Sequence, residues 1–300
     1  IGVLCLLLIL TTLAGHFANR MGVPSVIGQI LVGVLVGPAV LNWIQPSQLL
    51  SVFSDIGVVM LMFIGGLESN LELLRRYLKP AIIVAMSGVL MPVVLMGGAA
   101  MAFHFSAFEA TYIGVIFSAT SVSISVAVLQ EYQALDTSEG ATILGAAVAD
   151  DIIGVILLSV MISLMGTQGI ATHTDSIGLG WILVEQVLFF GGSYLVVRWF
   201  APYLMSLSEK FVMNASVTIM SMVICLGMAW IADLVGLSGA VGAFFAGIAV
   251  AHTPYREVVE AHMEPIGYAA FIPLFFVGIG LSMSFDYLGS SLGFIALMTV

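Results

Sequence analysis

The amino-acid sequence predicts an all-α polytopic membrane protein, built as an inverted-topology repeat with helices broken at the middle of the membrane. Hydrophobic residues make up 61% of the chain and charged residues 8%, with a mean hydropathy of +1.17, a balance that no soluble domain shows. The apolar residues form eleven runs divided by polar, Pro or Gly breaks. A single shift of 214 residues also aligns two early runs with two late ones.

The eleven runs are the predicted spans. They cover approximately residues 1–17, 24–38, 51–67, 80–103, 110–129, 141–165, 177–199, 211–233, 238–251, 262–283 and 290 to the end. Several are shorter than the roughly 18 residues that cross a bilayer without tilt. The connections are short, so we expect no second, soluble domain. The chain begins and stops inside apolar runs, and we therefore expect both ends to be cut.

The basic residues predict the orientation. With eleven spans, all seven Lys and Arg residues fall in loops or span ends on one side of the membrane, and the opposite loops carry none. They are Arg20, Arg75, Arg76, Lys79, Arg198, Lys210 and Arg256. The positive-inside rule assigns this side to the cytoplasm and leaves Ile1 outside.

The internal repeat predicts an inverted topology. Shifted by 214, the segment 22–28 falls on 236–242, Gly33 falls on Gly247, and Gly66 falls on Gly280. The second and ninth spans run in opposite directions, an arrangement typical of secondary transporters with a site at the midplane. Adding 214 to the fourth to sixth spans places their counterparts near 294–379, so we expect only the first of these residues here.

Two adjacent acids, Asp150 and Asp151, stand in the middle of the sixth span. Asp150 is the tenth residue of that run, about 15 Å along a helix and so near half-depth. A carboxylate at that depth costs several kcal/mol. Ala146 and Gly154 lie one turn to either side and leave room for water, an ion or another backbone. We interpret the pair as an ion- and proton-binding site. The alternative is a structural pair neutralised by a basic partner, but no Lys or Arg lies inside any span, Arg198 being at a span end.

The chemistry of the pair predicts competition between a cation and a proton. Carboxylate oxygens are hard ligands that suit Na+, Li+ or H+. Because removal from water disfavours the charged form of a carboxyl group, such a site holds either a proton or a cation, but not both. Adjacent residues point about 100° apart on a helix, so we expect unequal roles. One Asp should face the cavity and bind the ion, and the other should face a packed neighbour.

The fifth span carries an unusual run of hydroxyls, residues 118–125, with five Ser or Thr in eight positions. Such side chains bond back to the backbone and loosen a helix. Non-helical backbone at membrane depth is tolerated around a cavity, where it can hold ions. We therefore expect a broken helix beside Asp151, with Thr120 close to the ion; the alternative is a continuous helix packed through small residues. The predicted lining residues are Thr120, Ser121, Ser118 and Ser123.

Other features exclude competing classes. Cys5 and Cys225 lie in apolar runs and are interpreted as packing residues. An intramembrane aspartyl protease needs its two acids on facing helices, which adjacent residues cannot provide, so we expect no enzyme. A channel is the nearer rival. We expect no resident cofactor and no nucleic-acid partner.

With these residues in view, the chain resembles the bacterial monovalent cation:proton antiporter-2 family, particularly its sodium/proton exchangers with an Asp-Asp pair. The likeness covers essentially the whole chain. It is carried by the stretches 26–38, 57–68, 118–131, 145–151 and 273–281.

The resemblance implies a homodimer in the inner (plasma) membrane of a bacterium that moves a core domain like an elevator. By position, Asp151 looks like the carboxylate that binds Na+ and the proton, Asp150 like its partner, and Thr120 like part of the crossover of broken helices. Related glutathione-gated potassium efflux systems usually carry Gln-Asp at this pair, so a K+/H+ antiporter or a ligand-gated K+ efflux system is the alternative. The implied divisions are 1–67 and 211–283 for the dimerisation panel, 80–165 for the core, 177–199 for a linking helix and 290–300 for the start of a second core repeat.

Overall fold

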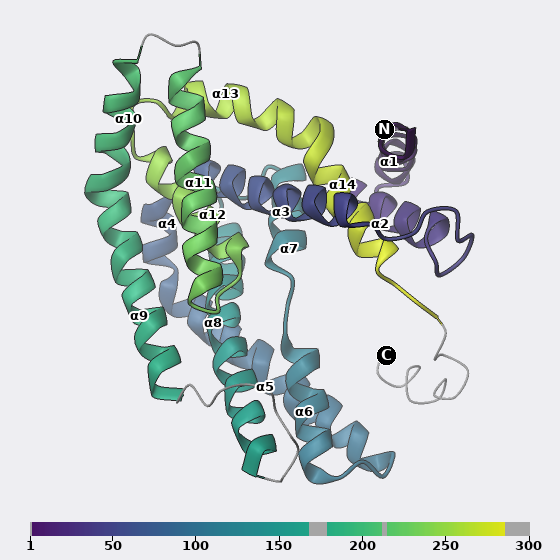
Figure 1. The fold of residues 1–300 in the computed structure, drawn as a ribbon. Helices are drawn as coiled ribbons and strands as arrows, with labels where there is room; N and C mark the ends of the chain where they lie inside the picture. The colour runs from purple at the N-terminus through teal and green to yellow at the C-terminus, as the bar shows by residue number, and fades with distance from the viewer. Residues whose placement is uncertain (1, 168–178, 212–214, 286–300) are drawn as a thin grey trace.

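The computed structural model describes residues 2–167, 179–211 and 215–285, and every regular element within these ranges is a helix (Figure 1). Among the described residues, eight helices are long and apolar enough to cross a membrane, and two shorter apolar helices accompany them. Many large apolar side chains on these helices are exposed, such as Phe17 of α1 and Leu90 of α5, as expected for surfaces that face lipid. The predicted all-α polytopic class is confirmed.

The chain opens with three helices, α1 (Gly2–Arg20), α2 (Ser25–Val36) and α3 (Gln48–Glu68). Between α1 and α2 the backbone reverses at Gly22, whose φ of +76° is in the left-handed region that glycine adopts without steric cost. Ser47 begins α3 as an N-cap, because its side chain accepts a hydrogen bond from the Leu50 amide at 3.4 Å.

The same arrangement returns near the end of the chain. α11 (Ser216–Leu234) and α12 (Gly239–Ala251) are followed by one long helical segment, which consists of α13 (Arg256–Ile266), the π-helical turn η2 (Gly267–Phe271) and α14 (Ile272–Leu281). The bounds of α11 are those of α1 moved by 214 residues at both ends, and Gly236, the counterpart of Gly22, has a φ of +75°. The internal repeat predicted from the sequence is thus present in the backbone.

The two repeats pack through glycines that exchange roles. A Cβ on Gly33 of α2 would lie 2.9 Å from the Cα of Gly280 in α14, and a Cβ on Gly66 of α3 would lie 3.0 Å from the Cα of Gly247 in α12. The shift of 214 turns the first pair into the second with its members swapped. The two crossings are therefore images of each other, as an approximate two-fold relation between the repeats requires. At both, the missing side chains let two backbones touch.

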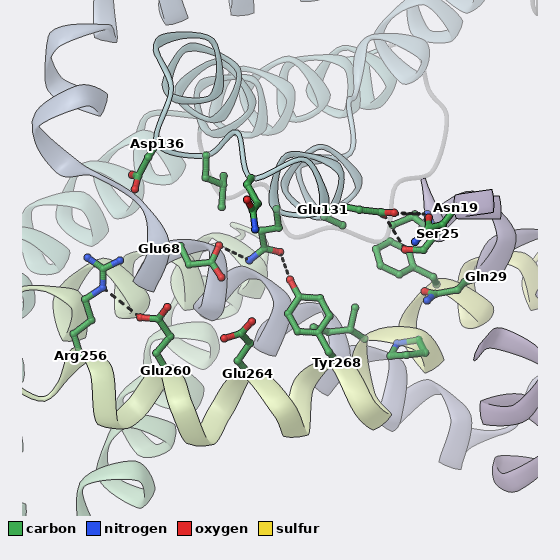
Figure 2. A pocket seen from close by; sticks show the side chains of 18 residues that line it. Asn19, Ser25, Gln29, Glu68, Glu131, Asp136, Arg256, Glu260, Glu264 and Tyr268 are labelled. Carbon is green, nitrogen blue, oxygen red and sulfur yellow. Dashed lines mark hydrogen bonds and ion pairs between the residues drawn. The ribbon is translucent and has the colours of Figure 1, made fainter. Parts of the chain in front are cut away.

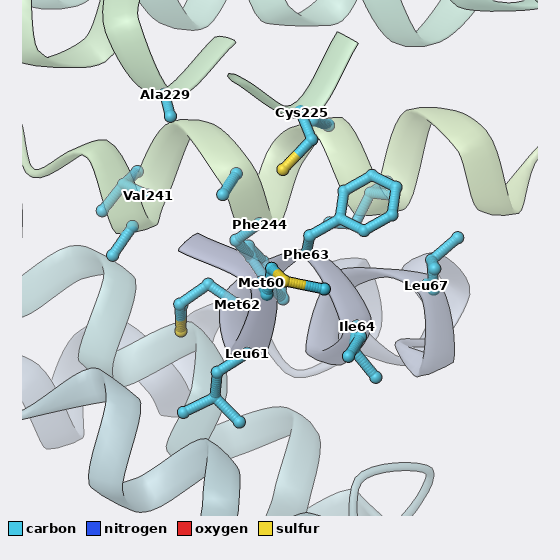
Figure 3. Packing of buried hydrophobic residues seen from close by; sticks show 14 of the residues in the cluster. Met60, Leu61, Met62, Phe63, Ile64, Leu67, Cys225, Ala229, Val241 and Phe244 are labelled. Atoms are coloured by element: carbon cyan, nitrogen blue, oxygen red, sulfur yellow. The ribbon is translucent and has the colours of Figure 1, made fainter. Parts of the chain in front are cut away.

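The main apolar core surrounds this crossing. α3 buries a continuous row of side chains from Met60 to Ile64, and these pack against α11 and α12 (Figure 3). Cys225 is 1% exposed and Phe244 is 2% exposed within the same cluster. Cys225 is therefore a packing residue, as predicted, whereas Cys5 is exposed on α1.

The helices that carry the predicted ion site lie between the two repeats along the chain. They are α4 (Leu71–Arg76), α5 (Leu78–Ala102), α6 (Ala107–Ser118), α7 (Val122–Glu131) and α8 (Ser138–Thr167). A capping box between Ser106 and Glu109 starts α6. α5, α6 and α8 pack beside one another, and in Figure 1 they extend away from the crossing of the repeats.

Ten of the eleven predicted spans coincide with helical segments, and the eleventh, from 290 onward, lies outside the described residues. The bounds differ where charges interrupt an apolar run. The span expected to end at 199 continues from α9 (Leu179–Leu195) through the π-helical turn η1 (Val196–Phe200) into α10 (Ala201–Glu209). The span expected to begin at 262 begins at Arg256. A charged side chain ends an apolar run without ending a helix, because exposed helical positions tolerate charge.

Candidate functional site

The predicted broken helix is present. α6 ends at Ser118, residues 119–121 are not helical, and α7 begins at Val122. Ala119 has φ −67° and ψ 116°, and Ser121 has φ −86° and ψ 105°. The break lies roughly 18 Å from the start of α6 and 15 Å from the end of α7, which is near the middle of the span. The alternative prediction for residues 118–125, a continuous helix packed through small residues, is wrong.

The hydroxyls of this stretch bond to the local backbone. Ser118 donates to the Val115 carbonyl at 2.8 Å, and Thr120 donates through Oγ1 to the Ser118 carbonyl at 3.3 Å. Ser121 is the N-cap of α7, with its Oγ accepting from the Ile124 amide at 3.4 Å. These bonds satisfy groups that a continuous helix would have paired, so the hydroxyl side chains stabilise the break.

Asp150 joins α8 to this break. Its carboxylate Oδ2 accepts a hydrogen bond from the backbone amide of Thr120 at 3.0 Å, and the residue is only 7% exposed. Asp150 lies about 18 Å along α8, so the contact connects two helices at about half their length. A negative oxygen facing the amides at the start of α7 is also favoured by the partial positive charge of a helix N-terminus.

Asp151 is placed differently. It is half-buried, and among the described residues no hydrogen bond or ion pair to its carboxylate is found. The next residue along a helix points about 100° away, so Asp151 does not share the contact that Asp150 makes. We predicted a broken helix beside Asp151 with Thr120 close to the ion, and the amide of Thr120 is bonded to the adjacent Asp150. Ser123, the remaining predicted lining residue, is buried near the start of α7.

The small residues around the pair serve two purposes. Ala146 packs against Ala81 and Ala85 of α5, and a Cβ on Gly145 would lie 2.9 Å from that of Ala81. This side of α8 is therefore a close helix–helix contact. At Gly154 a Cβ would meet no described atom within 4 Å, so space remains one turn beyond Asp150.

A second feature near this site was not predicted, namely an acid-lined cavity of about 600 Å³ at the far end of α7 (Figure 2). Its charged lining contains five carboxylates and one guanidinium, and the guanidinium is paired with a carboxylate at 3.5 Å. These groups belong to Glu68, Glu131, Asp136, Glu260, Glu264 and Arg256. Ala127 also lines the cavity, so it reaches to within roughly 8 Å of the break along α7.

Hydrogen bonds tie α7 to the repeats across this cavity. Gln130 donates through Nε2 to Glu68 at 3.3 Å and accepts from the Tyr268 hydroxyl at 2.8 Å (Figure 2). Glu131 accepts from the backbone amide of Ser25 at 3.0 and 3.1 Å and from its hydroxyl at 2.9 Å. Glu131 thus acts as an N-cap of α2 supplied by a distant segment, since the N-cap residue of that helix, Pro24, offers no side-chain acceptor.

The comparisons with known proteins agree along the whole chain. The family model described as sodium/hydrogen exchanger, transmembrane, matches residues 5–300. A Na(+)/H(+) antiporter of Enterococcus hirae is 48% identical over 300 residues, which are all of this chain and 77% of that protein. The Na(+)/H(+)-K(+) antiporter GerN of Bacillus cereus is 39% identical over 99% of this chain and 75% of its own length.

A solved structure also matches. The sodium proton antiporter MjNhaP1 of Methanocaldococcus jannaschii superposes with a TM-score of 0.60 at 18% sequence identity. The match covers 99% of this chain and 75% of that one. At this identity the likeness is evidence for the fold, and it extends over both repeats and the helices between them.

Proposed function

Since the chain belongs to the transmembrane sodium/hydrogen exchanger family, we propose that it is a secondary active transporter that exchanges Na+ for H+ across the membrane. The observation that carries the proposal is the hydrogen bond from the Thr120 amide to Asp150, which holds an acid pair against a broken helix at half-depth. Among membrane proteins, a carboxylate beside unwound backbone is the arrangement that binds and releases small cations.

The two acids take different roles in this proposal. Asp150 is engaged with the backbone of the break and fixes the position of the pair. Asp151 has no such partner among the described residues and is the carboxylate that binds either Na+ or a proton. Thr120, Ser121, Ser118 and Ser123 shape the broken helix that lines the site. Because one carboxylate serves both ions, binding of one releases the other, and this competition is sufficient for exchange.

The acid-lined cavity supplies the route to the site. Five carboxylates against one guanidinium make it electronegative, which raises the local concentration of cations. By the positive-inside rule this cavity opens to the cytoplasm of a bacterium, with Ile1 outside.

Alternating access requires α7 to move relative to the repeats. In this proposal residues 80–165 form the mobile core, residues 1–67 and 211–283 form the panel through which a homodimer assembles in lipid, and 177–199 link them. The bonds of Gln130 and Glu131 to Glu68, Tyr268 and Ser25 join the two parts. These bonds break and re-form in each transport cycle.

Reconstituted vesicles test the proposal. A pH gradient across proteoliposomes should drive Na+ uphill, and Asp151→Asn should abolish this while the protein keeps its thermal stability. Glu185→Gln is the matched control, since it neutralises an acid of α9 that bonds locally to Trp181. Unchanged exchange by Asp151→Asn refutes the assignment of the ion-binding residue. Passive Na+ flux without coupling indicates a channel and refutes the antiport.

Titration with different cations tests the choice of substrate. The Bacillus cereus relative is named a Na(+)/H(+)-K(+) antiporter, so K+/H+ exchange is the alternative. Exchange is measured with Na+, Li+ and K+ at pH 6–9 in the same vesicles. Proton movement driven by Na+ and not by K+ supports the proposal, and the reverse order supports the alternative.

A further inference from the structure

A second cavity, of about 700 Å³, lies between α4, the α9–η1–α10 segment and α12. It shares no lining residue with the acid-lined cavity or with the predicted ion site. Its polar groups are the phenol of Tyr194 and three basic side chains, namely Arg75 of α4, Arg198 of η1 and His252, which caps the C-terminus of α12. Below them the wall is apolar and includes Phe245 and Ile248. A positive mouth over an apolar floor is an amphipathic site.

The positive charge of this cavity is not neutralised by any acid among the described lining residues. None of the described residues that line it is an acid, and the single ion pair among the described residues joins Arg256 to Glu260 elsewhere. Arg75 and Arg198 come from different helices and are both exposed. The Nδ1 atom of His252 lies 2.8 Å from the Ile248 carbonyl, which leaves Nε2 for a ligand. Two guanidinium groups free to form paired hydrogen bonds are the side chains that suit a phosphate.

The level of the cavity in the membrane follows from its aromatic neighbours. Tyr194, Trp199 and Tyr203 on the same helical segment are 58%, 68% and 64% exposed. Exposed Trp and Tyr gather where lipid headgroups meet the hydrocarbon. Arg198 lies between them, in a π-helical turn of a kind often found at functional sites. The guanidinium groups therefore stand at headgroup level, with the apolar wall beside the acyl chains.

We propose that this cavity binds the phosphate headgroup of an anionic membrane phospholipid. Arg75 and Arg198 hold the phosphate, and an acyl chain lies along Phe190, Phe245 and Ile248. The volume falls within the roughly 300–1,000 Å³ typical of small-molecule sites. Basic pockets between membrane helices commonly recognise such headgroups. A soluble phosphate has the same charged group as the lipid headgroup but no acyl chain to contact the apolar wall. Comparing the binding of inorganic phosphate with that of the lipid therefore distinguishes the two ligands.

Lipid binding to the purified chain tests the proposal. Native mass spectrometry in detergent is used to titrate phosphatidylglycerol, phosphatidylcholine and inorganic phosphate separately. The unchanged chain should bind phosphatidylglycerol in preference to the other two. The double variant Arg75→Gln/Arg198→Gln should bind it at least about tenfold more weakly, because two charged hydrogen-bonding partners are lost.

Matched variants separate the site from general surface charge. Arg76→Gln/Lys210→Gln removes the same charge from nearby positions outside the cavity lining and should bind phosphatidylglycerol like the unchanged chain. Arg75→Lys/Arg198→Lys keeps the charge and the fold and should lose only part of the affinity. Equal losses in both glutamine pairs, or no loss in either, overturn the site. Equal binding of inorganic phosphate and of phosphatidylglycerol overturns the lipid.

Discussion

Replacing Gly66 by alanine should weaken the crossing of the two repeats. The new methyl carbon would lie 2.2 Å from the carbonyl oxygen of Phe244 and 3.0 Å from the Cα of Gly247. Heavy atoms that are not bonded rest at about 3.5 Å, so α3 and α12 must separate by about 1 Å. Overpacking costs about 1–3 kcal/mol, and loss of a helical glycine returns about 0.5–1 kcal/mol. We expect a net loss of about 1 kcal/mol in unfolding free energy.

Thermal unfolding of the purified protein in detergent measures this change, which should lower Tm by a few degrees. Gly33→Ala, at the equivalent crossing, should lower Tm by a similar amount, because its methyl carbon would lie 2.2 Å from the Val277 carbonyl oxygen. Gly98→Ala in α5 is the control, since no described atom lies within 4 Å of its added carbon. If Gly66→Ala and Gly98→Ala have the same Tm, the close approach of the backbones of α3 and α12 does not stabilise the packing of the two repeats.

Three further outcomes are expected. Thr120→Pro should abolish exchange while Thr120→Ala retains much of it, because Asp150 accepts a hydrogen bond from the Thr120 amide and not from its hydroxyl. Transport in vesicles measures both variants, and equal activity of the two refutes a role for this hydrogen bond. Glu131→Ala should lower the unfolding free energy by about 0.5–2 kcal/mol through loss of a helix cap, and Ser25→Ala by less, as measured by melting. With the other cysteine replaced by serine, Cys225 should react with a maleimide only on unfolding, since it is 1% exposed; rapid labelling of the folded protein contradicts the packing described.

The repeat was predictable because glycine marks it directly. Gly22 and Gly236 are needed for a left-handed turn, and Gly33, Gly66, Gly247 and Gly280 are needed where backbones touch, so the same shift of 214 recurs in the sequence and in the contacts. The contacts themselves were not predictable. A shift between equivalent residues does not reveal that Gly33 meets Gly280 and not Gly247, since that depends on how the two repeats cross.

The broken helix was predictable for a similar local reason. Hydroxyl side chains at Ser118, Thr120 and Ser121 can replace the backbone bonds of a helix, and each makes such a bond. The sequence did not indicate that the amide of Thr120 bonds to Asp150 in particular. Adjacent residues differ in direction by about 100°, but the sequence does not state how α8 is rotated about its axis.

The acid-lined cavity was beyond sequence reasoning. Its acids come from four separate segments, and each alone is an ordinary charge near a helix end. A weak signal was present in that Glu68, Glu131 and Glu264 all fall on the side of the membrane that carries the basic residues. Gathering them into one cavity requires the long-range packing of α7 against α3 and the bond from Gln130 to Tyr268 of η2.

The swapped glycine crossings also bear on how the chain is made. Gly33 meets Gly280, a residue synthesised 247 positions later. At roughly 5–20 residues per second, the ribosome needs about 10–50 s to produce that partner. During this interval the backbones of α2 and α3 at Gly33 and Gly66 are exposed in the membrane, and other helices with small residues can pack against them. Correct assembly therefore depends on these early helices staying unpaired until α14 has been synthesised.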